Sequence, residues 1–197
     1  MFKLKMKDFK TALSLLFFLT LITGIIYPLV VTGLAQLFFP QQANGSLVKQ
    51  GNKTVGSFLI GQSFTDAKYF WGRPSATSPF PYNGANSSGS NLGPSNPDFI
   101  KIIKERVIAL QQSNNKKSLI PVDLITASGS GLDPEISLLA AFYQVPRIAN
   151  SRHLAEKDIL QIVNYHMINR TFGILGEPRV NVLQLNLDLD QLRPRHG

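Results

Sequence analysis

The chain has 197 residues, a net charge of +8 and no cysteine. The length allows one domain of ordinary size beside a membrane segment, and the absence of cysteine excludes a body held by disulfides. Nucleic-acid binding is also excluded, because the basic residues cluster before the first apolar segment or lie scattered, without a stripe interleaved with aromatic residues.

Residues 11–39 are predominantly apolar and contain no charged residue. As a helix they would extend roughly 43 Å, whereas the hydrocarbon core of a bilayer is about 30 Å thick. We therefore predict a transmembrane helix. A signal peptide fits less well, since its apolar region is shorter and a small-residue cleavage site follows it. A buried core helix is the other alternative.

Three residues inside this segment, Gly24, Pro28 and Gly33, indicate either a tolerated kink or a face that packs against a membrane partner. The flanks predict the orientation. Lysines crowd the N-terminal side, and the first charge beyond the segment is Lys49. By the positive-inside rule, we expect a cytoplasmic tail at 1–10, the span at 11–39 and an extracytoplasmic domain at 40–197.

The first half of this domain is expected to hold one strand, one long loop and one helix. A short apolar run bounded by glycines predicts a strand at 55–60. The uncharged stretch 74–96 is rich in Asn, Ser and Gly, and we predict an ordered surface loop that touches a partner, with a flexible loop as the alternative. Asn96 is a good helix N-cap and Pro97 suits the first turn, so the 3–4 spacing that follows predicts a helix at 97–112.

The second half continues in the same mixed pattern, so we predict a single α+β domain. We expect a strand at 122–126, a glycine turn at 127–131, and a helix that opens at Asp133 and stops before Pro146. A further helix is predicted at 155–169. The near alternation of 180–189 predicts a half-buried strand with a bulge, and the tail 191–197 is expected to be loose.

No catalytic constellation emerges from the residues. The glycine turn lacks the Gly-Lys-Ser/Thr of a phosphate loop and the third glycine of a dinucleotide site. Ser113 begins an S-x-x-K match, which suggests a membrane-anchored serine hydrolase of the penicillin-binding type, but neither S-D-N nor K-T-G accompanies it. The three histidines have no metal-ligand spacing, so no metal site is expected, and His166 is expected to be a packing residue.

Several long segments of unusual composition resemble the KdpC family of subunits of bacterial Kdp-type potassium-transporting P-type ATPases. The resemblance runs nearly end to end, through TGIIYPLVVTGLAQ, GSFLIGQSF, YFWGRPSA, YNGANSSGSNLGP, PVDLITASGSGLDPEIS, AAFYQVPRIANSR and LGEPRVNVLQLNLDLD. It implies a non-catalytic accessory subunit of a high-affinity potassium pump in the bacterial inner membrane. The implied partners are a channel-like subunit, the P-type subunit that hydrolyses ATP, and a further small membrane subunit.

The resemblance also implies a role in assembly and stabilisation, and a proposed action as a catalytic chaperone that raises the ATP affinity of the catalytic subunit. No cofactor is expected on the chain alone, and ATP is expected only within the complex. The glutamine proposed to contribute to ATP binding falls at Gln144. The other interpretation of Gln144 is a hydrogen-bonding residue near a helix end, and the predicted orientation places it on the side opposite to cytoplasmic ATP. We therefore expect a scaffold, which binds its partners through Gly24, Pro28 and Gly33 in the membrane and through Tyr82, Asn91 and Leu92 outside it.

Overall fold

The computed structural model describes residues 6–114 and 118–192. The chain separates into two compact units, Met1–Leu47 and Val48–Gly197. The first unit holds α1 (Met6–Leu21), a π-helical turn (Ile22–Ile26), α2 (Tyr27–Phe38) and the single turn α3 (Pro40–Ala43). The helical stretch Met6–Phe38 is 33 residues long with a mean hydropathy of 2.3, so it is long and apolar enough to cross a membrane.

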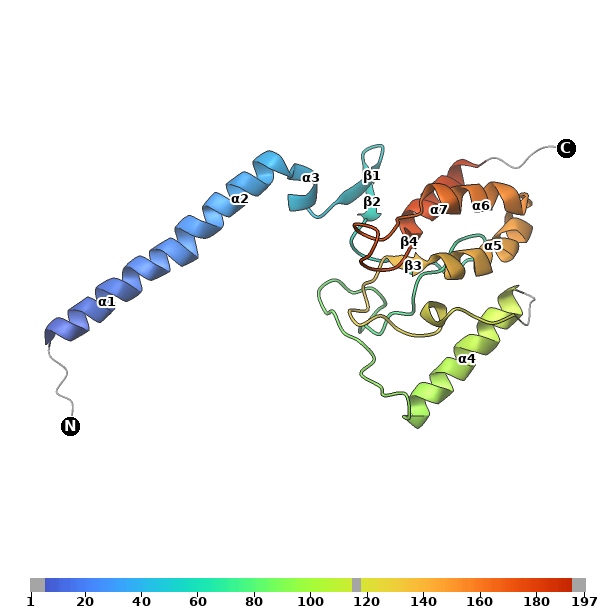
Figure 1. Ribbon diagram of the computed structural model, residues 1–197, viewed down its shortest axis with the longest axis horizontal. Coiled ribbons are helices and arrows are strands. Elements are labelled where there is room, and N and C mark those ends of the chain that lie inside the picture. Colours follow the sequence, from blue (N-terminus) through green and yellow to red (C-terminus); the bar gives the residue numbers. More distant parts are fainter. Residues whose placement is uncertain (1–5, 115–117, 193–197) are drawn as a thin grey trace. The chain divides into compact units, whose positions relative to one another are not determined.

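The π-helical turn ends at Ile26, two residues before Pro28. A proline in a regular helix has no amide to donate and clashes with the carbonyl four residues earlier. Here the Tyr27 amide donates to the Ile22 carbonyl, which is the spacing of a π turn. Because this turn absorbs the irregularity, α1 and α2 continue as one rod (Figure 1), and the sharp kink that Pro28 could cause does not form.

The second unit combines helices with two small sheets, as the α+β prediction requires. In chain order it contains β1 (Leu47–Gln50), β2 (Lys53–Ser57), α4 (Pro97–Asn114), a 3-10 turn (Val122–Leu124), β3 (Glu135–Ser137), α5 (Leu138–Arg152), α6 (Glu156–Tyr165), β4 (Arg179–Asn181) and α7 (Val182–Gln191). Strands β1 and β2 form one sheet, and β3 and β4 form the other. The β3–β4 pair is antiparallel, with Ile136 opposite Val180.

The core lies between α5, α6, α7 and the β3–β4 sheet. Helix α5 packs on α6, and α6 packs on α7. The Ser137 hydroxyl caps α5 by accepting from the Ala140 amide at 3.1 Å. The largest fully buried apolar side chains are Phe70, Ile136, Ile148, Ile159, Leu185 and Leu189.

The helix predicted at 97–112 is confirmed as α4. The strand predicted at 55–60 is only partly right, because β2 begins two residues earlier and already ends at Ser57. The helix predicted at 155–169 is α6 but ends at Tyr165, and Ile168 beyond it pairs with Arg179. Most of the tail predicted to be loose lies outside the described residues.

The predicted strand at 122–126 is wrong, because Val122–Leu124 form a 3-10 turn. The helix predicted to open at Asp133 is also wrong. The Asp133 carboxylate accepts from the Glu135 amide at 3.0 Å and forms an Asx turn, and β3 follows. Helix α5 therefore starts five residues later, at Leu138.

Helix α5 also continues through Pro146, where the prediction ended it. Beyond the proline, Ile148 and Ala149 are buried. Their burial offsets the lost hydrogen bond. The strand predicted at 180–189 is wrong as well, since α7 begins at Val182 after the Asn181 side chain caps it. Val182, Leu185 and Leu189 are spaced three and four residues apart, so they also satisfy a helical period.

Candidate functional site

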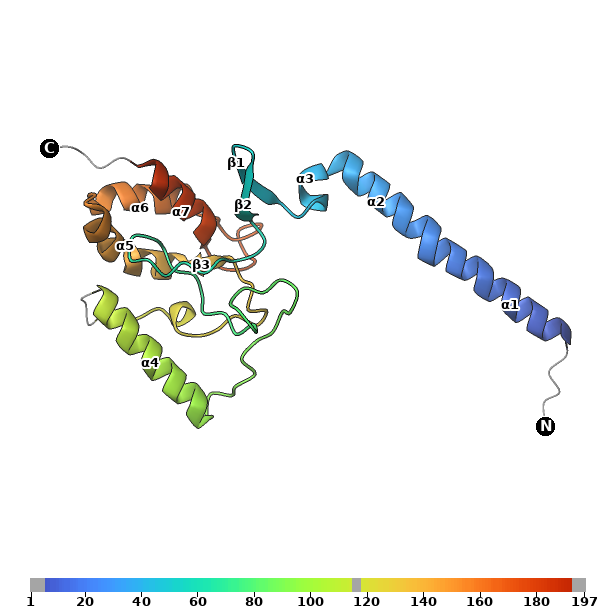
Figure 2. The same ribbon diagram turned by 180° about the vertical axis from the view of Figure 1, so that it is seen from behind.

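An irregular segment that begins in an exposed turn and leads to the buried Phe70 runs alongside helices of the second unit. We call Ala67–Trp71 the clamped segment, because all five of its carbonyls accept hydrogen bonds from side chains of α5 and α7. Figure 2 shows this part of the chain in teal, alongside those helices. Buried backbone groups must be paired, and here side chains take the place of a neighbouring strand.

Gln144 supplies one part of the clamp. Its Oε1 accepts from the Trp71 amide at 2.8 Å and from Arg147 Nη2 at 2.7 Å. Its Nε2 donates to the carbonyls of Trp71 at 3.1 Å and Ala140 at 3.2 Å. The side chain is 0% exposed. Both amide protons and both acceptor positions are therefore occupied within the chain.

Asn186 on α7 repeats this arrangement one residue earlier. Its Oδ1 accepts from the Phe70 amide at 2.8 Å, and its Nδ2 donates to the Phe70 carbonyl at 3.0 Å. Each amide thus binds the N–H and the C=O of a single residue, as a strand partner would. Asn186 and Gln144 hold successive residues from two helices.

Two arginines complete the clamp. Arg147 donates to the carbonyls of Ala67 and Tyr69, and its guanidinium lies 4.0 Å from the centre of the Trp71 ring. Burial lowers the pKa of Arg147 to about 10, so it remains charged at neutral pH. Arg152 donates to the Lys68 carbonyl at 2.7 Å. These donors fix the segment but leave Gln144 no bond to offer an outside group.

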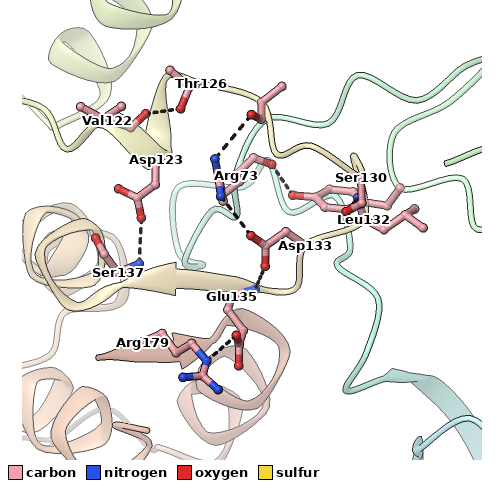
Figure 3. A network of polar contacts seen from close by, with 12 residues as sticks. Arg73, Val122, Asp123, Thr126, Ser130, Leu132, Asp133, Glu135, Ser137 and Arg179 are labelled. Atoms are coloured by element: carbon pink, nitrogen blue, oxygen red, sulfur yellow. Dashed lines mark hydrogen bonds and ion pairs between the residues drawn. The ribbon is translucent and has the colours of Figure 1, made fainter. Parts of the chain in front are cut away.

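A cleft of about 440 Å³ lies beside β3, and its lining includes two arginine–carboxylate pairs. Arg73 lies 3.1 Å from Asp133, and Arg179 Nε donates to Glu135 at 2.7 Å (Figure 3). Asp123 accepts from the Ser137 amide at 2.7 Å. Opposite charges are thus paired across the cleft, and no group of three or more His, Cys, Asp or Glu in residues 6–114 and 118–192 could hold a metal ion.

Tyr82, one of the predicted docking residues, packs inward. Its hydroxyl donates to the Arg73 carbonyl at 2.5 Å, and a Cβ on Gly61 would lie 2.4 Å from its ring. Burial, reinforced by the Asp133 carboxylate, raises the pKa of Tyr82 to about 12. Tyr82 therefore fastens the 74–96 loop to the body.

Other polar residues of the loop bond either to the body or to the loop itself. Ser75 Oγ donates to the Gly131 carbonyl at 2.7 Å, and Thr77 Oγ1 donates to the Phe80 carbonyl at 2.7 Å. Asn83 is buried and its amide donates to the Ser78 carbonyl at 2.9 Å. Of the other predicted docking residues, Asn91 is exposed and Leu92 is half-buried.

The predicted membrane contacts lie on an open helix surface. A Cβ at Gly24 would meet only Thr20 at 3.9 Å, and one at Gly33 would meet nothing within 4 Å. Pro28 is likewise exposed. The first unit thus leaves room at these positions for a neighbouring helix or lipid.

Ser113, a possible hydrolase nucleophile, and His166, a possible metal ligand or packing residue, both contact other groups of the chain. The Ser113 hydroxyl donates to the Leu110 carbonyl at 3.0 Å, and Lys116 of the S-x-x-K match lies outside the described residues. His166 Nε2 lies 2.7 Å from the Asp188 carboxylate.

Within residues 6–114 and 118–192, the structure defines a class of protein with one membrane-length helix followed by an α+β body, whose buried polar side chains bond to its own backbone. The family model described as KdpC, K+-transporting ATPase, c chain, matches residues 9–191. The chain belongs to this family.

Relatives of similar length support this membership. A potassium-transporting ATPase KdpC subunit of Dechloromonas aromatica is 55% identical over 184 residues, which cover 93% of this chain and 96% of the relative. The proteins of the same description from Polynucleobacter asymbioticus and Methylococcus capsulatus are each 56% identical, and cover 92% and 94% of this chain and 96% and 98% of their own lengths.

Proposed function

We propose that the chain is a non-catalytic, single-pass accessory subunit of an ATP-driven potassium uptake pump in the bacterial inner membrane. ATP hydrolysis would reside in another subunit, and ion selectivity in a channel-like one. Its relatives are described as KdpC subunits of potassium-transporting ATPases. The lysines before the helix support an orientation with the N-terminus in the cytoplasm and the body outside.

The observation that carries the proposal is that the membrane-length helix has no buried residue within its own chain. Gly24 and Gly33 leave gaps on its surface that a neighbouring helix can approach closely. The helix is therefore suited to pack on the membrane part of the channel-like subunit, and a small additional membrane subunit could share that surface. The exported body would then stabilise the assembled pump.

An effect on the ATP affinity of the catalytic subunit would be indirect. Gln144 is fully buried and its four hydrogen bonds are made inside the chain, so it does not fit a direct contact to nucleotide. A subunit that binds two states of the pump with different affinity shifts the ATP affinity without touching ATP. Such coupling typically amounts to about 1–3 kcal/mol.

Single cysteines test the orientation, because the chain has none of its own. Ser151→Cys lies at an exposed position of the body, and Lys10→Cys lies at an exposed position before the apolar span. In intact cells whose outer membrane has been permeabilised, an impermeant thiol reagent should label Ser151→Cys only. Lys10→Cys should label after the cytoplasmic membrane is breached, and the reverse order would refute the orientation.

Purification from membranes tests the assembly. The tagged full chain should carry two larger membrane proteins with it, one with potassium-translocating and one with ATPase activity. A chain that purifies alone from cells that express the whole pump would refute the accessory role.

A further inference from the structure

An apolar hairpin protrudes between α6 and β4. We define it as residues 168–179, with a tip formed by Phe172, Ile174 and Leu175. Phe172 is 89% exposed, Ile174 is 76% exposed and Leu175 is 57% exposed. Tyr165, at the end of α6 just before the hairpin, is 81% exposed. Large apolar side chains that stay this exposed on a surface are typical of an interaction site.

The hairpin is held in a defined shape by its own backbone bonds. At its base, Ile168 and Arg179 exchange both N–H···O bonds at 2.8 and 3.0 Å. Nearer the tip, Thr171 and Leu175 exchange bonds at 2.9 and 3.0 Å. Phe172 takes a left-handed conformation with φ of 55° and projects from the turn. An aromatic residue on a turn with a fixed backbone conformation loses little conformational entropy when it binds. This is typical of an anchor residue at a protein interface.

The charges of the hairpin indicate the chemistry of its partner. Arg170 Nη2 donates to Glu177 at 2.6 Å, and Arg179 is paired with Glu135. The tip itself carries no charge. A loop that inserts into anionic lipid usually adds unpaired Lys or Arg to its apolar residues. Here both arginines are neutralised by carboxylates, so a neutral protein pocket fits better than a lipid surface.

We propose that the hairpin tip docks into a neutral, apolar pocket on the extracytoplasmic face of a membrane-embedded subunit of the same ATPase. This inference rests on the proposed function and names the surface that would bind. It differs from the expectation that the 74–96 loop makes this contact. Tyr82 and Asn83 of that loop are engaged internally, whereas Phe172 and Ile174 have most of their surface free.

A photoreactive residue tests the docking in the whole pump. Benzoylphenylalanine is placed at Phe172 of the full chain, and a matched chain carries it at Leu119, which is 97% exposed. Irradiation of cells that express all subunits should give an adduct between position 172 and one partner subunit, at least tenfold stronger than at position 119. Three results at position 172 would overturn the proposal: adducts with lipid alone, adducts with a second copy of this chain, or no adduct. Equal adducts at positions 172 and 119 would overturn it as well.

A double variant provides a second readout. Phe172→Ser with Ile174→Ser should reduce the yield of co-purified partner subunits at least fivefold, while Leu119→Ser leaves it unchanged. Both variants should melt at the wild-type temperature, since the altered side chains are exposed. If the double variant co-purifies with its partner subunits as well as the wild type does, the docking inference fails but the accessory function stands. If the wild type itself co-purifies with no partner subunit, the accessory function fails.

Discussion

Replacing Gln144 by alanine should destabilise the body strongly, because it unpairs buried groups around the clamped segment. The Trp71 amide, the Trp71 carbonyl and Arg147 Nη2 would each lose a bond to the glutamine amide. A buried polar group without a partner costs about 1–3 kcal/mol. Allowing for relaxation and entry of water, we expect the free energy of unfolding to fall by about 3–5 kcal/mol in total.

Urea unfolding of the full chain in detergent measures this loss, and the fluorescence of Trp71 reports it, since Trp71 is the only tryptophan. With a denaturant slope of about 2 kcal/mol/M, the unfolding midpoint should fall by about 1.5–2.5 M. Asn186→Ala should cause a loss of similar size. Gln161→Ala, on the exposed surface of α6, is the control and should change stability by less than about 0.5 kcal/mol.

The same variants separate a structural from a nucleotide-binding role for Gln144. If Gln144 acts through the clamp, then Gln144→Ala and Asn186→Ala should change the KM of the pump for ATP in parallel. The reasoning is refuted if Gln144→Ala keeps the wild-type midpoint and alone raises that KM, because a stable fold with impaired ATP use would indicate direct contact.

Three further predictions follow from the packing of the body. Gly61→Ala should destabilise it by about 2–3 kcal/mol in thermal melts, because the added Cβ would lie 2.4 Å from the Tyr82 ring; Gly93→Ala, where nothing lies within 4 Å, should be neutral, and equal effects would contradict the geometry. The pKa of Tyr82 is near 10 in the unfolded chain but about 12 in the folded protein. The free energy of unfolding should therefore fall as pH rises from about 10 to 12, and urea titrations of Tyr82→Phe should show a smaller decline. Ser137→Ala should cost about 1 kcal/mol in the same titrations, since the Ala140 amide loses its cap, and an unchanged midpoint would place the start of α5 elsewhere.

Local signals in the sequence predicted some elements well. Asn96 and Pro97 mark the start of α4, whose apolar period is regular, and all but the last residue of the uncharged run 11–39 lies within the membrane-length helix Met6–Phe38. The errors arose where two patterns competed. In 180–189 the leucines fit an alternating strand and a helix equally, and the Asn181 cap decides for the helix. At Pro146, burial of α5 outweighs a local helix breaker.

The site was only partly predictable because its contacts join residues that are distant in the chain. Gln144 could be singled out through the family resemblance, but its partner Trp71 lies 73 residues away, and no local rule joins them. Asn186 carried a signal in the sequence, because it is a polar residue within a run of leucines. In the structure it is buried. Tyr82 and Phe172 are both aromatic residues in turns with positive φ, and only tertiary packing separates the one that points inward from the one that points outward.

The clamped segment also has a consequence for how the body opens. Its carbonyls bond to α5 through Gln144 and to α7 through Asn186, so one short peptide joins two helices that are distant in the chain. Neither helix can detach without releasing the peptide, and release of the peptide exposes polar groups on both helices. The three elements should therefore form a single cooperative unit, whose amides exchange with solvent together through the same global opening.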